Sequence, residues 1–123
     1  MAIQIVDTAR VPIKEPKPEA LEKLYIFRRS PEVMEFLEAH PFLVPLLVEA
    51  HDKIGEYFGP QPEVVLEIVT DPEVDDDREL FAFIQTGLSP EQALDKLERL
   101  DDDWWLDAAD RSEGKLCLHV EFA

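Results

Sequence analysis

The chain has little cysteine, little glycine and no long apolar run, and each shortage excludes a class of protein. Its 123 residues include one cysteine and four glycines. A single cysteine excludes an internal disulfide framework and suits a reducing compartment, so we expect a cytoplasmic protein. The glycines lie too far apart to form a phosphate-binding loop. No apolar run approaches the roughly 18 residues of a membrane span, and no signal peptide is recognisable, so we expect no membrane contact.

Positive charge is also scarce, because 12 basic residues face 28 acidic ones and the formal net charge is −16. Such a surplus argues against direct binding of nucleic acid by the acidic body and favours a basic protein partner. Residues 1–29 nevertheless hold six basic residues against four acidic ones. Together with Pro12, Pro16 and Pro18, this composition predicts an extended, basic strap over residues 1–19. The strap would either lie on the chain's own acidic body or act as an interaction arm.

The remaining residues, 20–123, are numerous enough for a single α+β domain with its own core. Apolar spacing predicts a short helix over residues 20–29. A second helix is expected to start at Ser30, as the N-cap, and to end before Pro41. A third, longer helix is expected to start at Pro41 or Pro45 and to end at Gly59.

A β-β-α-β unit is expected after these N-terminal helices. Residues 64–70 and 80–86 are rich in β-branched and aromatic side chains, which predicts a hairpin. Ser89 marks the start of the next helix, which is expected to continue through Ala93, Leu94, Leu97 and Leu100, and residues 115–122 alternate as a half-buried strand does. We expect a mostly antiparallel three- or four-stranded sheet with helices on one face, in which the last strand lies beside the first strand of the hairpin.

The most distinctive segment is the run Asp101, Asp102, Asp103, Trp104 and Trp105. Neighbouring residues of an α-helix point about 100° apart, so the two indoles cannot both face inward from one turn. Exposed aromatic side chains beside charges are typical anchors of protein interfaces. Two buried indoles would instead close the end of the core as a lid. Both interpretations stay open, and under the first these five residues contact the partner.

Two clusters resemble metal sites but lack the required spacing. Cys117, His119 and Glu121 share one strand face, with Glu67 as a candidate fourth ligand, but alternate strand residues lie about 7 Å apart. The alternating carboxylates of residues 71–77 resemble a calcium loop without its glycine and its final glutamate. A solvated strand face and a solvated turn are the simpler interpretations, so we assign no metal, no cofactor and no catalytic residue.

The function expected from these features is that of a small acidic binding or regulatory module that meets a basic protein, as an antitoxin or a nucleic-acid mimic does. One alternative is a homodimer without a ligand, in which a second copy covers the open face of the sheet. The other is a small metal-assisted hydrolase that uses carboxylates with His51 or His119. His40 and His51 have no candidate nucleophile nearby in the sequence, so a structural role is the simpler interpretation of both.

Several segments resemble a family of small acidic bacterial proteins, seen especially in cyanobacteria, that has no assigned activity. The residues that carry the resemblance are 41–47 (PFLVPLL), 71–73 (DPE), 88–91 (LSPE), Trp104-Trp105 and 115–117 (KLC). They are spread over most of residues 40–122. The resemblance implies no catalytic residue and no cofactor.

Overall fold

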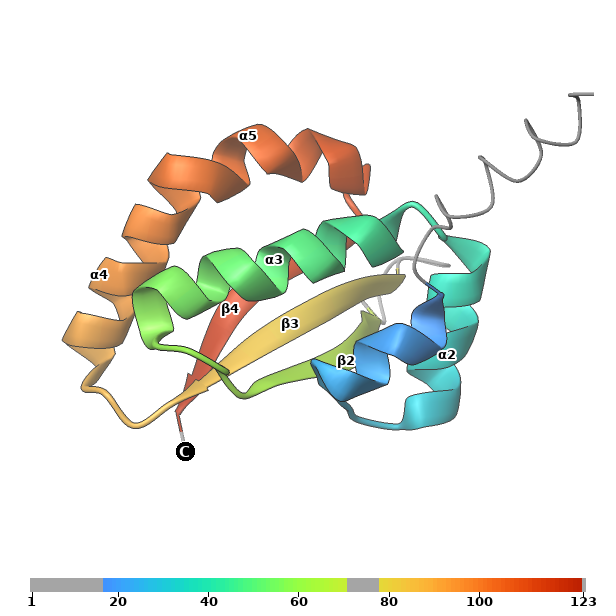
Figure 1. Cartoon of the computed structure of the whole chain (residues 1–123), viewed down its shortest axis with the longest axis horizontal. Helices are drawn as coiled ribbons and strands as arrows, with labels where there is room; N and C mark the ends of the chain where they lie inside the picture. The colour runs from blue at the N-terminus through green and yellow to red at the C-terminus, as the bar shows by residue number, and fades with distance from the viewer. Residues whose placement is uncertain (1–16, 71–77, 123) are drawn as a thin grey trace, which may run out of the picture.

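The computed structural model describes residues 17–70 and 78–122, which form an α+β fold around one mixed four-stranded sheet. The strands are β1 (Ile26–Phe27), β2 (Val64–Thr70), β3 (Arg78–Thr86) and β4 (Leu116–Phe122), and they lie in the sheet in that order. Figure 1 shows the long helix α3 (Leu43–Phe58) lying in front of β3. The predicted α+β class is confirmed.

The two helices before the hairpin begin and end near the predicted points. α2 (Ser30–Ala39) ends before Pro41, since the residue preceding a proline avoids the helical conformation. α3 begins between the two predicted starts and ends at Gly59, whose φ of 101° only glycine adopts without strain. The predicted cap at Ser30 is wrong, because Ser30 is already helical. Arg29, at a φ of 55°, holds the cap position without a side-chain hydrogen bond.

Residues 20–29 do not form the short α-helix that apolar spacing predicted. The chain instead forms a 3₁₀-helix, η2 (Pro18–Lys23), followed by the two-residue strand β1. Tyr25 lies buried between them, and its hydroxyl donates a hydrogen bond to the carbonyl oxygen of Leu47 at 2.7 Å. This bond fixes the segment to α3, and β1 pairs in parallel with β2. Tertiary contacts therefore override a weak local helical pattern.

The predicted β-β-α-β succession is found, but the predicted sheet order is wrong. β2 and β3 form the expected antiparallel hairpin. β4, however, pairs in parallel with β3 rather than antiparallel with β2, so two of the three pairings among the described strands are parallel. The reason is that β1 occupies the other edge of β2, while the helical crossover after β3 returns the chain in the direction of β3.

Alternate residues of β2, β3 and β4 enter one apolar core, to which α2 and α3 also contribute. The predicted alternation of β4 is confirmed along most of the strand. Leu116, Leu118 and Val120 are buried, while Phe122 at the end of the strand is exposed. The opposite face of the sheet, which we call the outer face, carries Phe81 and Phe83. Their rings stack at 5.4 Å and remain half-buried.

No helix among residues 17–70 and 78–122 is both long enough and apolar enough to cross a membrane. The predicted strap over residues 1–19 lies almost entirely outside the described residues, and so does the acidic segment 71–77 that resembles a calcium loop. The boundary between strap and domain therefore stays a prediction.

The cap of α4 (Pro90–Leu100) is the one that the sequence identified, since Ser89 Oγ accepts a hydrogen bond from the Gln92 amide at 3.2 Å. Ser89→Ala removes this acceptor, and we expect the free energy of unfolding to fall by about 1 kcal/mol. Ser30→Ala is the matched control, and its effect should stay below about 0.5 kcal/mol. Urea unfolding followed by circular dichroism measures both, and equal losses would contradict this assignment of the caps.

Candidate functional site

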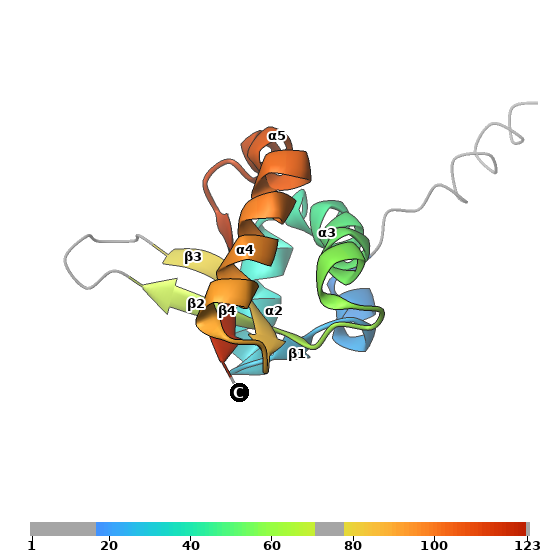
Figure 2. The ribbon, with the colours of Figure 1, turned by 90° about the vertical axis from the view of Figure 1, so that its left-hand side faces the viewer.

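The acidic and tryptophan residues that the sequence singled out lie on one continuous helical ridge. Residues 90–112 join four segments without a break: α4, the π-helix η3 (Asp101–Trp105), α5 (Leu106–Ala108) and the 3₁₀-helix η4 (Ala109–Ser112). Figure 2 shows α4 and α5 following one another along this ridge, beside α3. The ridge holds eight acidic and three basic residues, so we call it the acidic ridge.

The π-helical turn determines where the two tryptophans point. Trp105 is only 9 % exposed and belongs to the core, and the half-buried Trp104 packs against that core. The indole rings lie 5.6 Å apart with a tilt of 40°. A π-helix winds less per residue than an α-helix, so adjacent side chains diverge by less than the about 100° assumed from the sequence. Both indoles therefore turn toward the core, which favours the lid interpretation for them.

Glu49 of α3 fixes the ridge in place. Its carboxylate accepts hydrogen bonds from Trp104 Nε1 at 2.8 Å and from Arg111 Nη1 at 2.9 Å. These two donors, the indole first, hold the pKa of Glu49 below its ordinary value. One end of α3 makes a further bond, in which the Tyr57 hydroxyl donates to Asp103 and the pKa of Tyr57 is raised as a result. Both contacts join α3 to the π-helical turn.

The three neighbouring aspartates have different surroundings. Asp101 is half-buried, and burial raises its pKa, with further contributions from the charges of Asp102 and Glu98. Asp103 is exposed but engaged with Tyr57. Asp102 is exposed, and of the three it is the best placed to meet a partner.

Two exposed leucines on the ridge were not identified from the sequence as candidate partner-binding residues. Leu94 is 48 % exposed and Leu106 is 64 % exposed, so both apolar side chains face solvent. Glu98 and Asp102 are exposed at the four-residue steps between them. Residues four apart are neighbours on a helix surface, so each leucine lies beside an acid, and this spacing was the signal that could have found them. We call Leu94, Glu98, Asp102 and Leu106 the leucine–acid stripe.

The candidate metal ligands on β4 and β2 are spread across the outer face. β3 separates Glu67 from Cys117, and its Phe81 stands opposite both. Arg28 donates to Glu67 at 2.6 Å and to Glu121 at 2.9 Å, and it holds the pKa of Glu121 below its ordinary value. Burial raises the pKa of the Cys117 thiol. Within the part of the chain that the structure describes, no group of three or more His, Cys, Asp or Glu side chains is arranged to hold a metal ion.

The two histidines of the helical region pack against aromatic rings. His40 Nδ1 lies 2.9 Å from the carbonyl oxygen of Phe36, and the two rings lie 4.3 Å apart. His51 meets the buried ring of Tyr25 edge-on at 5.6 Å. These contacts support a structural role for both histidines.

Comparisons with known proteins do not assign the chain to a family. No protein-family model matches it, and no curated protein or solved structure matches it significantly. The resemblance to small acidic bacterial proteins therefore stays a prediction, and the function has to be inferred from the geometry of the chain itself.

Trp105→Ala should lower the free energy of unfolding by about 3–5 kcal/mol, because the change empties a large volume in the core. Leu106→Ala, one residue further along the ridge, is the control. Its exposed side chain should leave the stability within about 0.5 kcal/mol of the wild type. Thermal unfolding compares the two variants. A Trp105→Ala protein as stable as the wild type would contradict the placement of this indole in the core.

Glu49 should make the stability of the fold depend on pH in acid. Because its pKa is lowered in the folded state from an ordinary value of 4.5, it stabilises the fold above that pH. This contribution disappears as the pH falls through the folded-state pKa. Glu49→Gln should therefore be less stable than the wild type at neutral pH, and the two should converge in acid.

Urea unfolding from neutral pH down to about pH 3 measures this convergence. Glu22→Gln, an exposed position on η2, is the control and should follow the wild type throughout. If the difference in free energy of unfolding between Glu49→Gln and the wild type stayed constant with pH, that result would contradict the two hydrogen bonds to Glu49.

Proposed function

We propose that the protein is a small acidic binding module whose acidic ridge contacts a basic protein segment. The observation that carries the proposal is the leucine–acid stripe, in which each of two exposed leucines has an exposed carboxylate four residues away along the ridge. Opposite charges speed the encounter of two proteins, and apolar contacts at the interface slow their separation. The carboxylates of the stripe supply the charge, and its leucines supply the apolar contacts.

The basic residues of the ridge leave the stripe acidic. Arg99 pairs with Asp95 at 3.2 Å, and Arg111 pairs with Glu49 at 2.9 Å. Lys96 is two residues from both Leu94 and Glu98, which places it about 200° around α4 from them. The negative charge of Glu98 and Asp102 is therefore available to an incoming cation.

The shape of the stripe suggests the form of the partner. Leu94 lies on α4 and Leu106 at the start of α5, and the ridge bends between these two helices (Figure 1). A basic amphipathic helix that packs its apolar side against one of the leucines would bring Lys or Arg side chains to the carboxylate beside that leucine.

A protein that blocks a nucleic-acid-binding partner is the specific version of this proposal. Carboxylates three or four residues apart on a helix lie about 5–6 Å from one another, a charge density that resembles that of a nucleic-acid backbone. A basic nucleic-acid-binding surface would then be the natural partner, as for an antitoxin or a nucleic-acid mimic.

Neutralising three exposed acids of the ridge should slow association with a basic partner. The variant is Glu98→Gln/Asp102→Asn/Asp107→Asn, and the probe is an amphipathic helical peptide that carries lysines on one side and leucines on the other. We expect the association rate at about 0.15 M salt to fall severalfold, with a smaller change in the dissociation rate. Stopped-flow fluorescence measures both rates.

The matched control removes the same charge from another surface. Glu22→Gln/Glu35→Gln/Glu38→Gln changes three exposed acids on η2 and α2. It should keep the wild-type association rate within about a factor of two at about 0.15 M salt, because charges beyond a Debye length of roughly 8 Å are then largely screened. Equal slowing by the two triple variants would overturn the assignment of the ridge as the binding surface.

Affinity capture from a native lysate, followed by mass spectrometry, extends the test to natural partners. The wild type and the control triple variant should retain the same basic proteins at low salt and release them at high salt. The ridge triple variant should lose them. A set of captured proteins that contains no basic members, or that is indifferent to salt, would contradict the proposal.

The two alternatives have less support. Arg28 bridges Glu67 and Glu121 across the outer face, so a polar group interrupts the surface that a second copy would cover. A metal-assisted hydrolase would need a cluster of ligands, and residues 17–70 and 78–122 hold none. Both stay predictions.

A further inference from the structure

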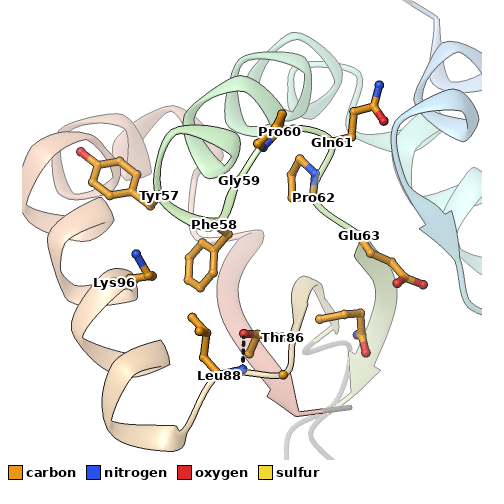
Figure 3. Close-up of a pocket in the computed structure, with 12 residues that line it drawn as sticks. Tyr57, Phe58, Gly59, Pro60, Gln61, Pro62, Glu63, Thr86, Leu88 and Lys96 are labelled. Carbon is orange, nitrogen blue, oxygen red and sulfur yellow. Dashed lines mark hydrogen bonds between the residues drawn. The ribbon is translucent and has the colours of Figure 1, made fainter.

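A hollow of about 620 Å³ lies where α3 ends and α4 begins (Figure 3). Residues 57–63, which lead out of α3, form one wall, and residues 85–88, which lead from β3 to α4, form the other. Lys96 of α4 borders the hollow from the flank opposite the leucine–acid stripe. Its volume falls within the range of roughly 300–1,000 Å³ that is usual for small-molecule sites.

The floor of the hollow is apolar. The ring of Phe58 and the side chain of Leu88 point toward each other from opposite walls, and both are half-buried (Figure 3). Pro60 and Pro62 stand above them. An aromatic ring that enters between Phe58 and Leu88 gains edge or face contacts as well as burial of apolar area.

The walls are held in shape by the backbone. Gly59 and Gln61 both have positive φ angles, 101° and 57°, on either side of Pro60. Gln61 is not a glycine, so its left-handed conformation is strained, and such strain is concentrated at functional sites. On the facing wall, the Leu88 amide donates to Thr86 Oγ1 at 3.0 Å. The shape of the hollow therefore does not have to be created when a ligand binds.

Lys96 provides a positive charge that is not already used. Among the described residues no ion pair is recorded for Lys96, and it is half-buried. Two acids of the adjoining surface have other partners, since Glu56 lies 3.8 Å from Lys53 and Asp95 lies 3.2 Å from Arg99. Glu63 also lines the hollow, on the side away from Lys96 (Figure 3), so an anionic group belongs on the Lys96 side. The net charge of the whole chain acts weakly here, because salt screens exposed charges beyond about 8 Å.

We propose that this hollow binds a small aromatic carboxylate, with the carboxylate on Lys96 and the ring between Phe58 and Leu88. The carbonyl end of α3 lies on the Phe58 side and carries partial negative charge, so the anionic group belongs on the Lys96 side. A single ammonium acts as a point charge that matches the single negative charge of a carboxylate. The site shares Lys96 with the acidic ridge but lies on the flank of α4 opposite the leucine–acid stripe, and it does not depend on the proposed function.

Titration of the ¹⁵N-labelled full chain with phenylacetate tests this proposal. Saturable shifts of the amide resonances of Phe58, Leu88 and Lys96 are expected. Phenylacetamide has the same shape without the charge, and it should bind roughly tenfold more weakly because it cannot form a charge-assisted bond with the ammonium. No saturable shift at the hollow, or equal binding of the acid and the amide, would overturn the proposal.

Two lysine variants identify the group that binds the carboxylate. Lys96→Met keeps the aliphatic stem and should weaken phenylacetate roughly tenfold while leaving phenylacetamide unchanged. Lys96→Gln should lose phenylacetate binding in the same way, and it serves as the second variant if the first does not fold. Lys115→Met removes the same charge at the start of β4, at the other end of the sheet from Thr86, and should change neither ligand. Equal weakening of phenylacetate by Lys96→Met and Lys115→Met would overturn the proposal.

Discussion

Burial of the Trp105 indole is the interaction on which the arrangement of the ridge depends. The indole enters the core from a π-helical turn, and the neighbouring Trp104 reaches Glu49 of α3 from the same turn. Ala93, Leu97 and Leu100 anchor α4 in the core, and this turn extends the anchorage toward α5. Leu94 and Leu106 are exposed because the opposite side of the ridge packs against the core.

Charge is distributed in the fold so that a strongly acidic chain can remain compact. Most carboxylates point to solvent, which keeps like charges apart. Two arginines connect elements that are distant in the sequence. Arg28 joins β2 to β4, and Arg111 joins the end of the ridge to α3. Lys96 differs from these two because it borders a hollow rather than bridging carboxylates. Two surfaces of opposite chemistry therefore lie on opposite flanks of α4.

Local signals made much of the secondary structure predictable. Pro41 and Gly59 mark helix ends, Ser89 is a true cap, and the alternation in β4 identifies its buried side. The sheet order was not predictable, because periodicity does not say which strand lies beside which. The two-residue strand β1 is too short to leave a pattern, yet it decides the order by occupying one edge of β2.

The candidate site was only partly predictable for a similar reason. The acidic run 101–103 and the tryptophan pair were recognised as one segment. The directions of these side chains depend on a π-helical turn, whereas a regular α-helix was expected from the sequence.

The parallel pairings of β1 with β2 and of β3 with β4 have a kinetic consequence. Each pairing requires the chain to close a long loop, and the entropy of closure is lost before the stabilising contacts form. The hairpin and the helices should therefore form early, and the two sheet edges should form late. The bridge from Arg28 to Glu121, which spans both edges, then marks the completion of folding.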